Sequence, residues 1–203
     1  AMLAAQVLLM GSQFIAFTYL AAYLEDVTGI DGALVSVFLM IFGVFSAIGT
    51  FAGGRFADVN ASRTLLVGNT VLVVGLAGLY VFGDSKPLVG VALALWGVVG
   101  FGVTPALQLR VISLAGQGAD LAATLGASAA NVGVASGAAI GGWALASFGI
   151  EEVPLTALVF AVIALPAVWA TRFLKVPSAP APVAGPVAQS AAESDSAPVV
   201  AGG

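Results

Sequence analysis

The chain contains no cysteine and no histidine, and only 8% of its 203 residues are charged. Without cysteine there are no disulfides and no thiol chemistry. Without histidine there is no Ser-His triad, no Cys-His nucleophile, no histidine-ligated haem and none of the commonest zinc sites. An intramembrane serine protease that uses a histidine base is excluded for the same reason, and no basic patch indicates nucleic acid. We therefore expect a protein that is not an enzyme and that uses no metal or cofactor.

Apolar residues, in contrast, are abundant. The hydrophobic fraction is 60% and the mean hydropathy is +1.10, far above the values of soluble globular proteins. Because lipid offers no hydrogen-bond partners, each long apolar run must satisfy its backbone internally as a helix. The composition therefore predicts an all-α membrane protein.

Charges and turn residues divide the chain into six apolar stretches, each long enough to cross a bilayer. We expect helices at about 2–24, 32–53, 64–82, 88–107, 121–148 and 154–171, which together form one half-bundle over residues 1–175. Residues 176–203 are rich in Ala, Pro and Ser and predict a disordered cytoplasmic tail. The chain begins directly inside the first apolar helix and lacks the basic leader of a signal peptide. We therefore expect it to be an excised piece of a longer protein.

The basic residues lie almost entirely at one end of the expected helices. The turns after the second and fourth helices and the end of the sixth carry Arg55, Arg63, Arg110, Arg172 and Lys175. The opposite end holds only Lys86 among basic residues. Basic residues are retained on the cytoplasmic side of a membrane. The count therefore predicts that both chain ends are cytoplasmic.

The fifth helix carries two different faces. Four glycines at helical spacing form a small-xxx-small stripe that allows close approach of another helix: Gly126, Gly133, Gly137 and Gly141. On roughly the opposite face lie Thr124, Ser128 and Asn131. Polar groups within a membrane tend to be functional, and we expect these three to line a substrate cavity. The alternative is that Asn131 bonds across to another helix.

Two further helices carry polar or aromatic stripes. In the fourth helix, Phe101, Thr104 and Gln108 share a face beside Trp96, which suits an amphiphilic ligand. Trp96 has a second interpretation, as packing or lipid-facing bulk. In the first helix, Gln6 and Gln13 lie seven residues apart on one face, and we expect them at a water-filled cavity.

The other small and acidic residues are interpreted more simply. In the second and third helices the small residues indicate packing only: Gly43, Ala47, Gly68, Gly75 and Gly78. All ten acidic residues are expected in loops or in the tail. This part of the chain therefore supplies no membrane carboxylate for proton coupling.

A short motif between the second and third helices has the spacing G-x-x-x-D-x-x-x-x-R, formed by Gly54, Asp58 and Arg63. Together with the runs 96–105 and 131–142, it resembles the C-terminal half of a twelve-helix major facilitator, in the branch of bacterial sugar-efflux and drug:proton antiporters. Val59 stands where the family motif usually has a basic residue, and Ala61 stands where it usually has glycine.

This resemblance implies a secondary transporter of the bacterial inner membrane that works by alternating access. Its partners would be the lipid bilayer, a small-molecule substrate, protons and an N-terminal six-helix half that this chain does not contain. The Gly54–Arg63 motif would help to lock one access state, and proton coupling would depend on the other half. The alternative from a different class is a self-contained six-helix homodimeric pore or membrane scaffold.

Overall fold

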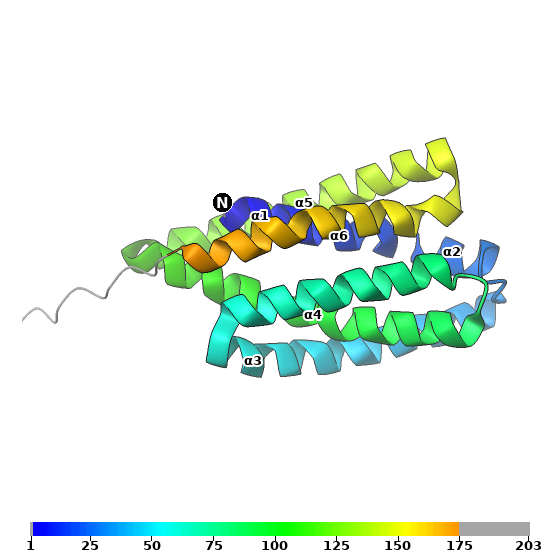
Figure 1. Ribbon diagram of the computed structural model, residues 1–203, viewed down its shortest axis with the longest axis horizontal. Coiled ribbons are helices and arrows are strands. Elements are labelled where there is room, and N and C mark those ends of the chain that lie inside the picture. Colours follow the sequence, from blue (N-terminus) through cyan, green and yellow to red (C-terminus); the bar gives the residue numbers. More distant parts are fainter. Residues whose placement is uncertain (1, 175–203) are drawn as a thin grey trace, which may run out of the picture.

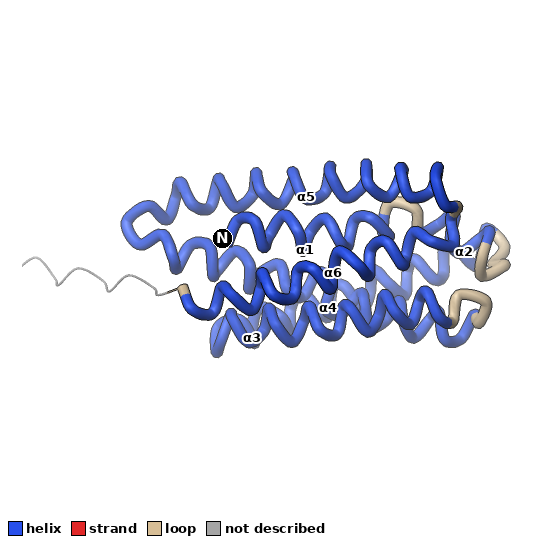
Figure 2. Tube along the Cα trace, turned by 45° about the horizontal axis from the view of Figure 1, so that its top comes forward, coloured by secondary structure: helices blue, strands red, loops and turns tan. Residues whose placement is uncertain are grey.

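The computed structural model describes residues 2–174, and these residues form helices joined by short turns (Figures 1 and 2). The predicted tail at 176–203 lies outside the described residues. The helices are α1 (Met2–Phe17), α2 (Leu20–Asp26), α3 (Gly32–Val81), α4 (Lys86–Ala115), α5 (Ala119–Phe148) and α6 (Val153–Ala170). Three short 3₁₀ turns, η1 (Gly116–Gly118), η2 (Ile150–Glu152) and η3 (Thr171–Phe173), complete the described chain.

Five helical stretches of the described residues are long and apolar enough to cross a membrane, counting α1 and α2 together. One of them, α3, has 50 residues. A straight helix of that length would extend about 75 Å, more than twice the roughly 30 Å hydrocarbon core. In Figure 1 the chain of α3 reverses at one end of the bundle, so that α3 crosses twice. The expectation of an all-α membrane protein is thus confirmed, with six crossings.

The reversal of α3 takes place at Asn60, whose backbone leaves the helical region (φ −159°, ψ 92°). The Asn60 side-chain oxygen accepts a hydrogen bond from the backbone N–H of Arg63 at 2.9 Å. This is the geometry of an N-cap, which satisfies one of the free N–H groups at the start of a helix. The first arm (32–59) and the second arm (61–81) are therefore joined without the ten-residue loop that the sequence predicted.

The first predicted helix, 2–24, is interrupted where the sequence indicated none. The break between α1 and α2 falls at Thr18 and Tyr19. On the two sides of the break, the Tyr19 hydroxyl donates to the carbonyl of Ala138 (3.0 Å) and the Tyr23 hydroxyl donates to the carbonyl of Leu79 (2.6 Å). These bonds tie the broken segment to α5 and to the second arm of α3, so neighbouring helices support the break.

The helices form two layers (Figures 1 and 2). One layer contains α1, α5 and α6, and the other contains both arms of α3 together with α4. The start of α1, the Asn60 turn, the η1 turn and the end of α6 all lie at the same end of the bundle. This end, called the Asn60 end below, includes Arg55 and Arg63 beside Asn60, Arg110 in the last part of α4 and Arg172 in η3.

Each layer has one helix pair in very close contact through glycine. In the first layer, a β-carbon placed on Gly133 would lie 2.7 Å from the carbonyl oxygen of Val7, and one on Gly141 would lie 2.6 Å from that of Ile15. A β-carbon on Gly137 would run into the backbone of Gly11. Gly126 differs from these three, since its nearest neighbour is Val111 of α4. The partner of the predicted glycine stripe is therefore mainly α1.

The second pair joins α3 to α4, and the sequence did not reveal it. β-Carbons on Gly49 and Gly53 would overlap the carbonyl oxygens of Val98 and Gly102. Both glycines are buried. Gly43, which the sequence indicated as a packing residue, is exposed and has no atom within 4 Å of its β-carbon position among the described residues.

Candidate functional site

Polar side chains of α1 and α4 meet at Gly126 of α5. A β-carbon on Gly126 would lie 3.7 Å from Oε1 of Gln6 and 3.7 Å from Oε1 of Gln108. Gln6 is buried and its Oε1 has no hydrogen-bond partner among residues 2–174. The structure therefore brings two of the predicted site residues, Gln6 and Gln108, to the same side of Gly126.

A similar arrangement lies about two turns further along α1, beside Gly100 of α4. A β-carbon on Gly100 would lie 2.6 Å from Oε1 of Gln13 and 3.2 Å from Nε1 of Trp96. Within the described part of the chain, neither Nε2 of Gln13 nor Nε1 of Trp96 has a hydrogen-bond partner. Leaving a buried donor unpaired costs about 1–3 kcal/mol, so such atoms point to a place where water or a ligand completes the bonding.

Trp96 and three phenylalanines form an aromatic cluster. The ring of Phe42 in α3 lies 5.1 Å from Trp96, centroid to centroid, and the ring of Phe17 in α1 lies 6.4 Å away. Phe101 contacts both phenylalanines at 6.2 Å. These are edge-to-face or tilted contacts, the arrangements that aromatic pairs prefer. With 1% of its surface exposed, Trp96 is a packing residue in this conformation, whereas Phe101 is half-buried.

The predicted polar face of α5 is exposed. Two of its hydroxyls bond within their own helix: Thr124 to the carbonyl of Asp120 and Ser128 to that of Thr124, each at 3.0 Å. Asn131 is also exposed and makes no side-chain hydrogen bond to the rest of the described chain. Unlike the two hydroxyls, its amide is not bonded to the backbone of the preceding turn. Asn131 is therefore the residue on this face that needs an outside partner.

The predicted cavity residues thus fall into three groups. Gln6, Gln13 and Trp96 are buried among α1, α4 and α5, while Phe101, Thr104 and Gln108 are half-buried on α4. Thr124, Ser128 and Asn131 are exposed on α5. The nine residues are therefore not all brought together, because Gln6 and Gln13 are buried inside the bundle and the three α5 groups are exposed on its outside.

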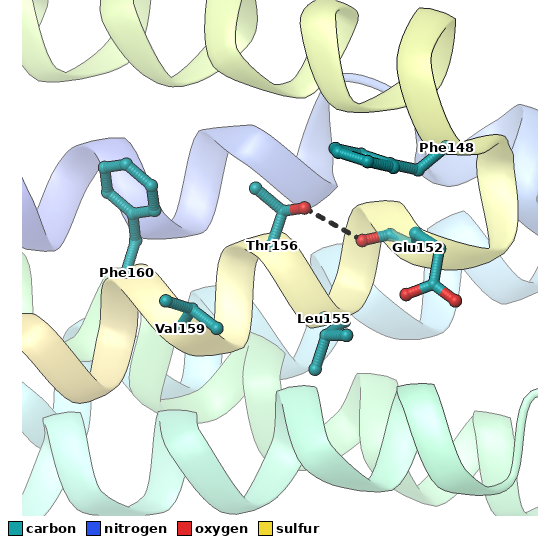
Figure 3. Close-up of a pocket in the computed structure, with 6 residues that line it drawn as sticks. All are labelled: Phe148, Glu152, Leu155, Thr156, Val159 and Phe160. Atoms are coloured by element: carbon teal, nitrogen blue, oxygen red, sulfur yellow. Dashed lines mark hydrogen bonds between the residues drawn. The ribbon is translucent and has the colours of Figure 1, made fainter.

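Two grooves occur elsewhere on the bundle, and none of those nine residues lines either one. One groove of about 510 Å³ lies beside α6 and is shown in Figure 3, lined by Phe148, Glu152, Leu155, Thr156, Val159 and Phe160. There the Thr156 hydroxyl donates to the backbone carbonyl of Glu152 at 3.0 Å. The second groove, of about 550 Å³, lies at the Asn60 end.

The three motif residues are not joined to one another. Gly54 is half-buried, and Asp58 and Arg63 are both exposed, with no ion pair between them. Arg63 uses only its backbone N–H, in the bond to Asn60. Asn60 was not singled out in the sequence, although asparagine is one of the preferred residues at a helix N-cap.

Two other buried polar residues were missed as structural links. Arg110 donates from Nη2 to the carbonyl oxygens of Thr171 (2.9 Å) and Leu174 (2.8 Å), at the carboxyl end of α6 and η3. Asn69 is fully buried and donates from Nδ2 to the carbonyl of Ala161 at 3.3 Å. Asn69 could have been found from the sequence, because it is a lone amide within an apolar helix. The partners of Arg110 are 61 and 64 positions away, and no local pattern indicates them.

Arg110→Met is expected to destabilise the full-length protein by about 1.5–3 kcal/mol, the range for hydrogen bonds to charged groups. The carbonyls of Thr171 and Leu174 would lose their donor, and the negative end of the helix would lose a nearby cation. The measurement is thermal unfolding in detergent. Arg55→Met removes an exposed arginine from the same end and is the control. Equal melting temperatures for the two variants would contradict the link.

Comparison with known proteins identifies the family. A sequence model of the Major Facilitator Superfamily matches residues 2–201, and the chain belongs to this superfamily. The Inner membrane transport protein YdhP of Escherichia coli O157:H7 is 32% identical over 156 residues, which cover 76% of this chain and 40% of that protein. A probable sugar efflux transporter of Helicobacter pylori (strain J99) is 24% identical over 147 residues, 72% of this chain and 38% of that protein.

The chain is therefore an integral membrane protein of a transporter family, and the suspected resemblance is confirmed. It spans about two fifths of the length of the curated relatives it matches.

Proposed function

We propose that this chain forms the C-terminal half of a secondary active transporter, which exports sugars or amphiphilic drugs by alternating access and is driven by protons. The relatives support this proposal, since one is named a probable sugar efflux transporter and each is about two and a half times as long as the matched region. That length favours a two-half transporter over a self-contained six-helix homodimeric pore or scaffold.

The observation that carries the proposal is the exposed amide of Asn131 near the middle of α5. Exposed polar groups at membrane depth are tolerated where they face water, a substrate or another helix bundle, and not where they face lipid. On α4, the half-buried side chains of Thr104 and Gln108 offer the same hydrogen-bonding groups, although Gln108 lies beside Gly126 and not on this face. We infer that this face meets the substrate path between the two halves.

The character of this face limits the substrate. Amide and hydroxyl groups beside exposed apolar residues of the same helix, such as Val132, suit a ligand with apolar area and a few hydrogen-bonding groups. The acidic residues within 2–174 lie in turns or close to helix ends; Asp58 and Asp120 are helical but near the Asn60 end. A proton carrier at the membrane midplane therefore belongs to the N-terminal half.

We assign the Asn60 end to the cytoplasm. The start of α1 and the end of α6 lie there (Figure 1), and Arg55 and Arg63 flank Asn60. Arg110 bonds to Thr171 and Leu174, on either side of Arg172. The positive-inside bias then makes both ends of the described chain cytoplasmic.

Transport by the full-length protein in proteoliposomes tests the proposal. A panel of neutral sugars and amphiphilic cations is assayed with and without an imposed pH gradient. We expect at least one substrate to move against its own gradient only when the pH gradient is present. Transport that is insensitive to the pH gradient would contradict proton coupling, and flux of ions without substrate selectivity would favour the pore.

Asp58→Asn is expected to shift the balance of access states by about two- to fivefold and to slow transport, with unchanged yield. The carboxylate is free in this half, so it is available to the positive end of a helix in the other half, an interaction worth about 0.3–1 kcal/mol when exposed. The measurement is reactivity of single cysteines on the outer side of the membrane. Asp84→Asn, which is exposed at the opposite end, is the control. An unchanged labelling pattern with normal transport would remove Asp58 from the mechanism.

A further inference from the structure

The groove of about 550 Å³ at the Asn60 end lies between the two arms of α3 and α4, and we call it the α3–α4 groove. Its walls are mainly small and branched apolar residues, such as Ala52, Val67 and Val103. Its polar lining residues are Asn60, Arg63 and Thr64, which come from the first turn of the second arm. The walls extend roughly 8–10 Å along the two arms of α3, from Phe56 back to Gly49 on the first arm and from Arg63 to Gly68 on the second. The groove is therefore apolar along most of its length and polar at one end.

The surface around this groove has the character of a lipid-facing surface. The second arm of α3 exposes Val67, Val74 and Val81, which repeat every seven residues on one face and are each more than half exposed. The hydroxyl of Thr70 on the same arm bonds to the carbonyl of Leu66 at 2.9 Å and needs no outside partner. At the mouth, Val59 is 85% exposed and Phe56 is 66% exposed. Apolar side chains with no unpaired polar group between them are suited to acyl chains.

The charge at the mouth is positive. Arg63 is the charged residue among those lining the groove, and its guanidinium is free of ion pairs within the described residues. The helix that starts after Asn60 presents its positive end at the same place. Arg55 and Asp58 are exposed nearby on the first arm but do not line the groove. A cation above an apolar channel at a membrane surface matches a phosphate above an acyl chain.

We propose that the α3–α4 groove is a binding site for one anionic phospholipid of the adjacent leaflet. An acyl chain occupies the apolar part between the arms of α3 and α4, and the headgroup phosphate pairs with Arg63. The site is separate from the polar face of α5, so it does not depend on which substrate is transported. The bound lipid would fill the space beside the motif residues and hold the two arms of α3 in a fixed spacing.

Native mass spectrometry of the full-length transporter tests this proposal. The protein is released from nanodiscs that contain equal amounts of phosphatidylglycerol and phosphatidylcholine, and the retained lipids are counted. We expect one phosphatidylglycerol to be retained in preference to phosphatidylcholine. Arg63→Gln should lower this retention about fivefold, the ratio that corresponds to one arginine near an anionic surface. Arg55→Gln, which removes an equal charge outside the groove, should leave it unchanged.

A second variant tests the apolar part without changing charge. Ala52→Phe places a ring in the groove and should also reduce retention of phosphatidylglycerol, whereas Ala139→Phe on the exposed face of α5 should not. Circular dichroism and gel filtration confirm folding of each variant. Equal losses with Arg63→Gln and Arg55→Gln would show unspecific charge attraction and overturn the proposal. Equal retention of the two lipids, or a crosslink placing the N-terminal half in the groove, would overturn it as well.

Discussion

Replacing Gly137 with leucine is expected to leave almost no monodisperse full-length protein after extraction in detergent. A β-carbon at this position would run into the carbonyl oxygen of Gly11 and lie 3.0 Å from its Cα atom. Both are backbone atoms, which cannot move aside as the end of a side chain can. Because α1 and α5 touch along this line, a branched side chain must push the two helices apart and remove the contacts on both sides.

Yield and gel-filtration profile are the measurements for Gly137→Leu. Ala139→Leu on the same helix is the matched control, since Ala139 is exposed on the face that also exposes Val132 and Trp143. The control should be extracted and eluted normally. If Gly137→Leu is equally well folded but inactive, the α1–α5 contact is a surface that moves during transport and not a fixed one.

Asn131→Leu is expected to reduce transport by about tenfold or more without lowering the yield. One hydrogen bond contributes up to about 1.5 kcal/mol, which corresponds to about a factor of ten in binding, and the leucine would also obstruct the polar face. Initial rates of transport in proteoliposomes measure the effect. Ser128→Ala provides the control on the same face, because that hydroxyl already donates its one hydrogen to the carbonyl of Thr124. Rates within twofold of the wild type for both variants would contradict a substrate role for this face.

The helical class and the glycine stripe of α5 were predictable because they depend on local patterns. Gly133, Gly137 and Gly141 repeat every four residues, which places them on one face whatever the partner helix is. The Gly49–Gly53 pair has the same spacing, but it is hidden in a uniformly apolar helix that contains other glycines, among them Gly43, which is exposed.

Other features depend on distances that sequence periodicity does not contain. Gln6 and Gln13 share a helix face as expected, but whether that face meets water or α4 and α5 is decided by tertiary packing. In the sequence, Arg110 was interpreted only as a positive charge that sets the orientation of the helices in the membrane. Its bonds to the end of α6 became visible only when both helices were placed. The turn at 54–63 looked like a loop because its glycines and charges suggest one, whereas the Asn60 cap allows helix on both sides.

Substrate protection of single cysteines tests most directly the central claim that the exposed face of α5 lines the transport path. The chain contains no cysteine of its own, so Asn131→Cys, Val74→Cys and Gln13→Cys are made in a full-length background from which any other cysteine has been removed. A membrane-impermeant thiol reagent should label Asn131→Cys, and transported substrate should protect it. Val74→Cys, on the lipid-facing surface of the second arm of α3, and the buried Gln13→Cys should remain unlabelled in this conformation. Equal labelling at positions 131 and 74, or labelling at 131 that substrate does not change, would contradict the account.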